Sequence, residues 1–311
     1  MTDVLRSTDF QWLGEKYTGK VRDVYAQENR LILITTDRHS SFDRIIAHIP
    51  HKGQVLNQIS EFWFDATKDI VPNHVLEIPD PNVTIGRKCF MLPVEAVVRG
   101  YITGVTGTSL WTLYSAGKRD FGNFTLPDGM KKNQKLGQPV FTPSTKKDTH
   151  DRTLSPQEMV AEGIIEKEMI EQVEKVALAL FARGQEIAIQ QGLILVDTKY
   201  EFGLDSNGVL TLIDEIHTPD SSRFWQLDSY EARFSQGEEP EYFDKEFLRL
   251  WFKENCDPYK DETLPEAPQE LVDELSRRYI RMYEQITRKT FEPGETPVVQ
   301  RLEKALRPYA V

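Results

Sequence analysis

The sequence predicts a fold that combines β-strands with α-helices, and three stretches carry this prediction. Residues 17–49 indicate strands in succession. Residues 193–214 indicate a strand, a turn and a returning strand. Residues 226–311 become acidic and show the amphipathic spacing of helices. At 311 residues the chain can hold one large domain or two to three modest ones.

The composition is that of an ordinary globular protein, with 39% hydrophobic and 28% charged residues. No apolar run approaches the roughly 20 residues that span a bilayer, and the first residues, MTDVLRSTDFQW, lack the layout of a signal peptide. Cys89 and Cys256 form no CxxC pair, which argues for a reducing compartment and against structural zinc or disulfides. The net charge of −11 disfavours nucleic-acid binding. We therefore expect a cytoplasmic protein that binds neither nucleic acid nor membrane.

The central hairpin carries charged residues with an informative spacing. Side chains of a strand alternate between its two faces, so Asp197, Lys199 and Glu201 share one face. Asn207 and Gly208 are the strongest short hairpin signal, because a type I′ turn needs positive φ at both central residues.

The length of this turn decides which residues of the two strands are opposite each other. A two-residue loop places Glu201 opposite Asp214, and a four-residue loop places Lys199 opposite Asp214. In both registers Glu201 and Asp214 share a face of the hairpin. In an arbitrary hairpin, such a charged face is simply exposed to solvent. In the two-residue register the two carboxylates would be roughly 5 Å apart and would repel each other. A hard divalent cation such as Mg²⁺, completed by phosphate oxygens, is the natural candidate between them.

Two further positions combine a glycine with basic residues. Gly19, Lys20, Val21 and Arg22 lie where a strand pair could lay a glycine-containing edge over phosphates, with Lys20 and Arg22 facing the same way. As a motif this is weak, because such a pair on a surface hairpin usually has no ligand. Arg99 closes an apolar strand at a glycine, and burying it requires an anionic partner.

The other segments are predicted from periodicity and helix caps. Residues 104–114 indicate a glycine- and hydroxyl-rich turn before a short helix, whose N-terminus suits an anion. Residues 36–44 indicate a polar loop. Helices are expected at 54–67, after a capping box at Ser155, at 167–190, and in the tail at 243–253 and 271–288. Domains are expected at 1–87, 88–235 and 236–311.

Together these features favour an enzyme that uses ATP. Carboxylates would hold Mg²⁺, the cation would bridge phosphates, and lysines would neutralise the charge that develops in phosphoryl transfer. The sequence contains no GxxxxGK[ST] motif, no complete set of HRD with DFG, and no readable Ser-His-Asp or Cys-His arrangement. The residues alone therefore predict an ATP- and Mg²⁺-dependent transferase or ligase that acts on a small anionic substrate.

Seven motifs in this order resemble the phosphoribosylaminoimidazole-succinocarboxamide synthase (SAICAR synthetase) family. They are GKVRDVY (19–25), TDRHSSFD (36–43), KGQVLNQISEFWF (52–64), PVEAVVRGYITG (93–104), FTPSTK (141–146), DTKYEFG (197–203) and DEIHTPDSSRFW (214–225). The match spans about residues 15 to 255, and the compound pattern is specific although each piece alone is weak.

The resemblance implies a fold and a reaction. The fold would be α+β and ATP-grasp-like: a small antiparallel N-terminal domain covers ATP, a larger α+β domain carries the hairpin, and C-terminal helices pack on it. The enzyme would join L-aspartate to the carboxylate of carboxyaminoimidazole ribonucleotide (CAIR), with ATP and Mg²⁺, by way of an acyl phosphate. It would act as a monomer or a homodimer.

The resemblance also implies roles for individual residues. Glu201 and Asp214 would be the Mg²⁺ ligands and, with Lys199, the catalytic residues. The expected nucleotide contacts are Gly19, Lys20, Val21, Arg22, Lys88 and Lys146, with the two metal ligands. The expected substrate contacts are Arg99, Ser109, Arg223 and Lys199, with Asp37, Ser40 and Asn57 as weaker candidates. Extra residues in RGYITGVTGTSLW leave Thr106 as an alternative to Ser109.

Two rival hypotheses come from other classes of protein. One is another ATP-grasp-like ligase or small-molecule kinase, and the other is a non-catalytic nucleotide-binding module. A requirement for both CAIR and aspartate, with stoichiometric ADP release, would separate the predicted enzyme from the first. Survival of ATP-dependent function in Asp214→Asn would favour the second.

Overall fold

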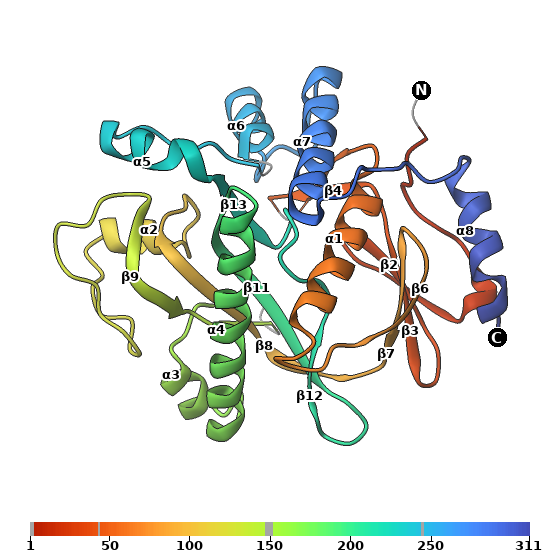
Figure 1. Cartoon of the computed structure of the whole chain (residues 1–311), viewed down its shortest axis with the longest axis horizontal. Helices are drawn as coiled ribbons and strands as arrows, with labels where there is room; N and C mark the ends of the chain where they lie inside the picture. Colours follow the sequence, from red (N-terminus) through yellow and green to blue (C-terminus); the bar gives the residue numbers. More distant parts are fainter. Residues whose placement is uncertain (1–2, 43, 147–151, 244–245) are drawn as a thin grey trace.

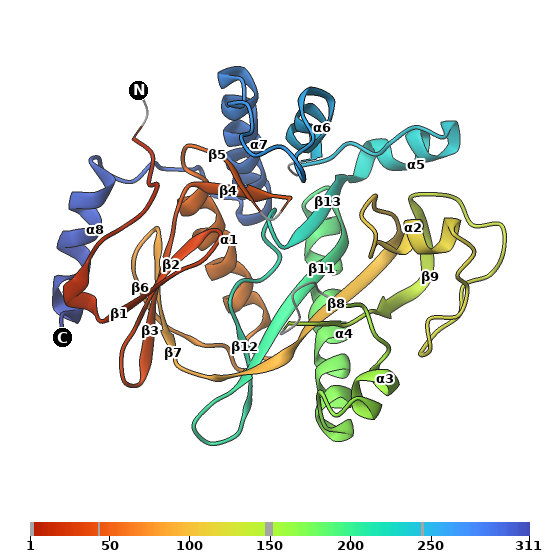
Figure 2. The same cartoon turned by 180° about the vertical axis from the view of Figure 1, so that it is seen from behind.

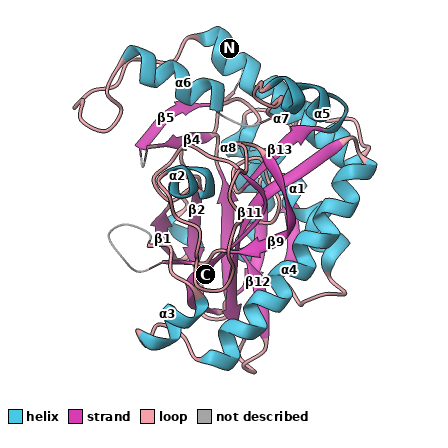
Figure 3. Cartoon of the chain, turned by 90° about the vertical axis from the view of Figure 1, so that its left-hand side faces the viewer, coloured by secondary structure: helices cyan, strands magenta, loops and turns pink. Residues whose placement is uncertain are grey.

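The computed structural model describes residues 3–42, 44–146, 152–243 and 246–311. In these residues the longer strands form two antiparallel sheets, and helices lie around them (Figure 1, Figure 3). The predicted α+β fold is thereby confirmed. No helix of the described residues is long and apolar enough to cross a membrane.

The first sheet is built from the N-terminal part of the chain. Its strand order is β1-β2-β3-β7-β6, with the bounds β1 (Glu15–Thr18), β2 (Arg22–Ala26), β3 (Arg30–Thr35), β6 (Val75–Asp80) and β7 (Val83–Arg87). Tyr25, Ile32 and Ile34 of this sheet are buried together with Leu302 and Leu306 of α8 (Val298–Leu306). The last helix of the chain therefore covers the first sheet (Figure 1), whereas we expected the tail helices to pack on the larger domain.

The second sheet carries the central hairpin. Its core order is β10-β8-β11-β12, while β13 also pairs with β11 and β9 with β8. The bounds are β8 (Phe90–Ile102), β9 (Gln134–Phe141), β10 (Ser144–Thr145), β11 (Leu193–Leu204), β12 (Leu210–Ile213) and β13 (Ser222–Gln226). The long helix α4 (Lys167–Gln190) packs along β11 and β8 (Figure 2). It ends before a glycine in the left-handed region, Gly192, with φ 73°.

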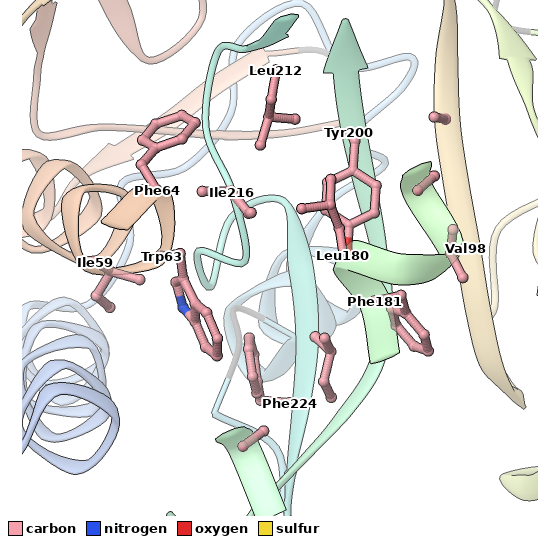
Figure 4. Close-up of a cluster of buried hydrophobic side chains, with 14 of the residues drawn as sticks. Ile59, Trp63, Phe64, Val98, Leu180, Phe181, Tyr200, Leu212, Ile216 and Phe224 are labelled. Carbon is pink, nitrogen blue, oxygen red and sulfur yellow. The ribbon is translucent and has the colours of Figure 1, made fainter. Parts of the chain in front are cut away.

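Helix α1 (Lys52–Thr67) contacts β3 of the first sheet and packs into the core of the second. Its Ile59 and Trp63 are buried in the same hydrophobic cluster as Leu180 of α4 and Tyr200 of β11 (Figure 4). α7 (Gln269–Thr287) packs against the outside of α1. The remaining elements are α2 (Leu110–Ser115), α3 (Pro156–Ala161), α5 (Leu227–Gln236), α6 (Glu246–Asn255) and the 3₁₀ helices η1 (Gln11–Leu13) and η2 (Arg307–Tyr309). The capping box before α3 is present.

Two segments within residues 17–49 differ from the prediction. The stretch expected as a polar loop instead contains a two-stranded sheet, β4 (Arg38–Ser41) with β5 (Arg44–His48). Several of its polar residues are buried: Arg38 is 3% exposed and donates to Asp23 at 2.8 Å, and His39 and Ser41 are buried too. The polarity of this stretch concealed its strand character. The start of the stretch expected as successive strands is interrupted by a turn between β1 and β2, in which Gly19 N donates to the carbonyl oxygen of Arg22 at 2.8 Å.

The register of the central hairpin is neither of the two predicted registers. Glu201 pairs with Ile213 and Leu204 with Leu210. The loop is a three-residue loop with a bulge, in which Asp205 N donates to the Val209 carbonyl and Gly208 N to the Asp205 carbonyl, both at 3.0 Å. Gly208 has φ 76°, and Asn207 has no positive φ.

A side chain within the turn explains this difference. The Asp205 carboxylate accepts hydrogen bonds from the backbone N–H groups of Asn207 and Val209, at 2.8 and 2.9 Å. Such an Asx-type turn favours a type I geometry followed by one left-handed residue over the type I′ geometry. Asp214 lies just beyond β12, with φ 66°, so the chain leaves the strand direction at this carboxylate.

Candidate active site

Glu201 lies between two lysines on the open face of β11. Its Oε1 accepts from Lys199 Nζ at 2.5 Å, and its Oε2 accepts from Lys146 Nζ. Lys199 Nζ also donates to Glu95 Oε1 at 3.1 Å, and Glu95 is the direct partner of Glu201 across β8 and β11. Desolvation acts to lower the pKa of Lys199, but Glu95 and Asp214 outweigh it and raise the pKa. Lys199 is therefore a fixed cation among carboxylates.

Asp214 is held by an arginine from the first sheet. Arg22 Nη1 donates to Asp214 Oδ1 at 2.6 Å, and Nη2 donates to Glu215 Oε2 at 2.7 Å. Desolvation acts to raise the pKa of Asp214, but Arg22, Lys199 and Lys146 outweigh it and lower the pKa. Asp214 is therefore ionised at neutral pH. This pair also joins the first sheet to the loop after β12.

The structure brings Glu201 and Asp214 into one electrostatic group, although the register does not place them directly opposite each other. Lys146 and Lys199 both contact Glu201, and both lower the pKa of Asp214. This group of Glu95, Lys146, Lys199, Glu201 and Asp214, with Arg22 and Glu215, is called the carboxylate–lysine group below.

The donor set of the carboxylate–lysine group fits Mg²⁺. Among the described residues there is no cluster of three or more His, Cys, Asp or Glu side chains that could hold a metal. Mg²⁺ does not require one, because it is commonly bound by one or two carboxylates together with waters and substrate phosphates. Glu201 and Asp214 offer such hard oxygen ligands, and the lysines beside them can pair with the phosphates.

A second charged group lies further along the same strand. The partners of Asp197 on the neighbouring strands are Arg99 of β8 and Arg223 of β13. Arg223 Nε lies 3.2 Å from Asp197 Oδ1, and Arg99 Nε donates to Thr142 Oγ1 at 2.8 Å. Burial lowers the pKa of Arg99 to about 10, and Arg223 adds to this shift while Asp197 opposes it. Two guanidinium groups thus share one carboxylate, which leaves positive charge for an anionic ligand.

Ser109 lies beside this arginine group. Its Oγ donates to the Thr106 carbonyl at 2.7 Å and is 2.8 Å from Thr112 Oγ1. Gly104, with φ 101°, permits the approach, because a Cβ there would be 3.0 Å from both Ser109 Oγ and Arg223 Nη1. Ser109 is 1% exposed, whereas the Thr106 side is open. The structure therefore brings the predicted Ser109 to Arg223, with Thr106 nearby on the surface.

Two cavities flank Arg223, and Arg249 of α6 lines both of them. The first cavity is also lined by Thr103, Gly104, Val105, Thr106, Lys132 and Tyr242. The second is also lined by Asp197, Pro219, Asp220, Ser221 and Ser222. Arg249 thus brings α6 beside the arginine group, and its Nε donates to Ser41 Oγ of β4 at 3.3 Å.

The predicted nucleotide contacts are only partly brought together. Gly19, Lys20 and Val21 form the turn between β1 and β2, directly before Arg22. Lys88 is exposed after β7, where its backbone N–H donates to the Asn29 carbonyl at 3.2 Å. Asn29 lies in the turn between β2 and β3, whereas Gly19 lies in the turn before β2. Lys88 is therefore at the opposite end of β2 from the Gly19 turn.

The weaker substrate candidates have partners within the fold. The Asp37 carboxylate accepts from Leu5 N at 2.7 Å and from Gly53 N at 2.8 Å, at the start of α1. Asn57 Oδ1 accepts from Thr84 Oγ1 at 2.9 Å, and the residue is 4% exposed. Ser40 lies on β4, half-buried. Asp37 and Asn57 therefore serve the packing of α1 against the first sheet.

Sequence reasoning missed four charged residues of the site as candidate ligands or contacts. They are Glu95, Asp197, Glu215 and Arg249. Glu95 stands on the same strand face as Arg99, four positions away, so the period-two rule could have found it. The same rule did place Asp197 on the face of Lys199 and Glu201, but no role was assigned to it. Glu215 is adjacent to Asp214. Arg249 carried no signal, because the acidic tail showed no motif of its own.

The family model for SAICAR synthetase matches residues 15–266 of this chain. A phosphoribosylaminoimidazole-succinocarboxamide synthase from Legionella pneumophila (strain Lens) is 58% identical over 284 residues, which cover 91% of both chains. The chain belongs to the SAICAR synthetase family. The chloroplastic enzyme of Arabidopsis thaliana is 53% identical over 294 residues, which cover 94% of this chain and 72% of that one.

Solved SAICAR synthetases share the fold. A SAICAR synthase from Saccharomyces cerevisiae complexed with SAICAR has a TM-score of 0.80 and 32% identity, covering 93% of this chain and 100% of that one. A SAICAR synthetase in complex with ADP has a TM-score of 0.67 and 26% identity, covering 90% of this chain and 100% of that one. The predicted family and activity are confirmed: this is an ATP-dependent ligase of purine biosynthesis that joins L-aspartate to the carboxylate of CAIR.

Proposed function

We propose that the two charged groups on β11 divide the ligation between them. The carboxylate–lysine group would bind the ATP phosphates and transfer the γ-phosphoryl group, while Arg99, Ser109 and Arg223 would hold the phosphate of CAIR. One observation carries this proposal. Asp197, Lys199 and Glu201 stand on one face of β11, so a single strand positions both groups.

The reaction needs activation because a carboxylate is a poor electrophile. A CAIR carboxylate oxygen attacks the γ-phosphorus of ATP, the bond to the β–γ bridging oxygen breaks, and ADP leaves. The aspartate amine then attacks the carbonyl carbon of the acyl phosphate and loses a proton. The C–O bond to the phosphate breaks, so inorganic phosphate leaves with an oxygen that began in CAIR.

The residues of the carboxylate–lysine group fit the first step. Lys199 and Lys146 are cations that Glu201 fixes in place, and they can neutralise charge on the transferring phosphoryl group. Arg22 fixes Asp214 as an ionised carboxylate. Glu201 and Asp214 would hold Mg²⁺, which would supply positive charge against the phosphate oxygens.

The arginine group fits the ribonucleotide. A planar guanidinium donates two parallel hydrogen bonds to phosphate oxygens, which a lysine does not. Burial lowers the pKa of Arg99 to about 10, because Asp197 does not fully offset the loss of hydration. A phosphate dianion at Arg99 and Arg223 would relieve this. Arg249, which lines both cavities beside Arg223, is a further contact for an anionic substrate.

Transfer of an isotope from CAIR to phosphate tests the acyl phosphate. CAIR labelled with ¹⁸O in its carboxylate would be turned over with ATP, aspartate and Mg²⁺, and the released phosphate analysed by mass spectrometry. We expect one labelled oxygen in each phosphate, because phosphate leaves with the attacking oxygen. Phosphate that contains only unlabelled oxygen would show that the carboxylate is not phosphorylated and would overturn the mechanism. Turnover without aspartate would instead indicate a kinase.

A further inference from the structure

One loop carries a proposed ligand at each of its ends. Residues 214–221 connect β12 to β13, beginning with Asp214 of the carboxylate–lysine group. Arg223 of the arginine group is the second residue of β13, directly after this loop and Ser222. Any shift of the loop as a whole would therefore move both groups at once.

The middle of this loop is anchored in the core. His217 is fully buried and has φ 49°, a left-handed conformation that an ordinary residue rarely adopts. Its Nε2 lies 2.5 Å from the hydroxyl of Tyr200, which is also fully buried. Trp63 of α1 presents its ring at 86° to the imidazole, with centroids 4.7 Å apart. Figure 4 shows Trp63, Tyr200 and the neighbouring Ile216 in this same core.

Tyr200 connects the loop to the catalytic strand. It lies between Lys199 and Glu201 on β11, and alternation along the strand directs its side chain to the opposite face. The hydrogen bond to His217 therefore joins the strand that carries Lys199 and Glu201 to the loop that carries Asp214, from behind the site.

A glycine of α4 makes room for the imidazole. A Cβ on Gly184 would lie 2.4 Å from Cε1 and 2.9 Å from Nδ1 of His217, and 2.7 Å from Leu195 Cδ2. Nδ1 has no hydrogen-bond partner among the described residues. Burial lowers the pKa of His217 to about 3 and raises the pKa of Tyr200, so both groups are neutral. If the Tyr200 O–H donates to Nε2, only Nδ1–H of His217 lacks a partner. If Nε2–H donates instead, both Nδ1 and the tyrosine O–H lack one, so the first arrangement is favoured.

We propose that Tyr200 and His217 are positioning residues, whose hydrogen bond holds loop 214–221 so that Asp214 and Arg223 stay in register with Lys199 and Glu201. The inference rests on the proposed roles of Asp214 and Arg223. Tyr200 and His217 are both fully buried, and Tyr200 points away from the strand face that carries Lys199 and Glu201. Their hydrogen bond couples the geometry of the nucleotide group to that of the ribonucleotide group.

The test is Tyr200→Phe in the full chain, which removes the hydroxyl and keeps the ring. Thermal unfolding, kcat and the KM values for ATP and CAIR would be measured well below the melting temperature. We expect both KM values to rise about tenfold, as found when an outer-shell contact of a site is lost. A purely structural hydrogen bond would lower only the melting temperature. Unchanged KM values for both substrates would overturn the proposal.

Two further variants make the test specific. Tyr230→Phe is the matched control, because it removes one buried hydrogen bond, from the Tyr230 hydroxyl to the Asn133 carbonyl at 2.8 Å, outside this loop. It should leave both KM values unchanged. Gly184→Ala should raise both KM values by displacing His217, although alanine favours a helix more than glycine does. Wild-type KM values in a folded Gly184→Ala protein would contradict the proposal.

The outcome separates this inference from the proposed function. If Asp214→Asn loses activity while Tyr200→Phe keeps wild-type KM values, the metal and substrate roles stand and only the coupling is wrong. If Asp214→Asn keeps wild-type activity, the proposed function itself fails, whatever Tyr200→Phe does.

Discussion

At the scale of single residues, the site depends on carboxylates that remain charged in a partly desolvated setting. Each has a cation within hydrogen-bonding distance: Lys199 and Lys146 for Glu201, and Arg22 for Asp214. Removing one partner from such a group leaves the other charges unbalanced. Asp214 is the most informative to change, because Arg22 would keep Glu215 as a partner and the fold should survive.

Asp214→Asn should therefore weaken the binding of Mg²⁺ while largely preserving the stability of the fold. We expect the Mg²⁺ concentration for half-maximal activity to rise about 10- to 100-fold, with a fall in kcat, because a neutral amide is a poorer ligand for a hard cation. The measurement is ADP release at varied Mg²⁺, alongside circular dichroism.

Asp128→Asn supplies the control for this change. Asp128 is an exposed carboxylate, 90% accessible, that pairs with Arg119 at 2.8 Å. Its loss should alter neither the Mg²⁺ dependence nor kcat, because exposed ion pairs contribute little. An Asp214→Asn enzyme with the Mg²⁺ dependence of the wild type would exclude this residue as a metal ligand.

The residues that sequence reasoning could find are those related by strand periodicity. Asp197, Lys199 and Glu201 were expected to share a face because a strand alternates at period two, and Lys199 does contact Glu201. The pairing of Arg22 with Asp214 joins residues 192 positions apart. Only the packing of the first sheet against the hairpin loop creates it, so no local pattern could predict it.

At the scale of elements, the central hairpin shows where local rules compete. The Asn207-Gly208 signal predicted a turn at the correct place, but the Asp205 carboxylate selected a different type of turn. The register consequently moved by one residue, and Asp214 left the strand with φ 66°. Turn position could be predicted from composition, whereas register required knowledge of one side chain's hydrogen bonds.

Gly208→Ala tests this description of the turn. Gly208 is left-handed, with φ 76°, and a Cβ there would meet nothing within 4 Å. The cost is thus conformational and should be about 1–2 kcal/mol in the free energy of unfolding, as measured by urea denaturation. Gly137→Ala in β9 is the matched control, because it also meets open space but has no positive φ. Equal stability of the two variants would contradict the left-handed assignment, and kcat should be unchanged in both.

At the scale of the whole molecule, the hydrophobic core of each sheet is built from parts of the chain that are distant in sequence. Leu302 and Leu306 of α8 complete the core of the first sheet, and α1 from the N-terminal part lies in the core of the second. Sequence periodicity predicted the tail helices at 243–253 and 271–288, but α8 itself was not singled out. Which sheet a helix covers depends on long-range packing, and amphipathic spacing contains no information about the partner.

This packing also buries histidines, which makes the stability of the whole fold depend on pH. Burial lowers the pKa of His74 to about 4 and that of His217 to about 3. The unfolded chain takes up protons on these groups below about pH 6.5, whereas the folded protein does not. The two histidines therefore contribute their full share of the stability above pH 6.5, and this contribution is lost as the pH falls towards 4. Each histidine should lower the free energy of unfolding by about 2 kcal/mol at pH 5.

Asp37 opposes this loss in the same range. Burial raises its pKa to about 6, so the folded state binds a proton more tightly than the unfolded state, whose pKa is near 3.8. Protonation of this carboxyl should raise the free energy of unfolding by about 1 kcal/mol between pH 7 and pH 5. Carboxylates with lowered pKa values, such as Asp23 and Asp214, lose their contribution only below about pH 4. The net effect of His74, His217 and Asp37 is a loss of about 2–3 kcal/mol from pH 7 to pH 5.

Urea unfolding followed by tryptophan fluorescence at pH 7, 6 and 5 would measure this loss. His74→Gln should remove about 2 kcal/mol of it, because the glutamine does not titrate and the unfolded state gains one proton fewer. His48→Gln is the matched comparison: burial also lowers the pKa of this half-buried histidine at the end of β5, and its replacement should change the pH dependence less. If His74→Gln lost as much stability between pH 7 and pH 5 as the wild type, His74 could not be a source of the effect.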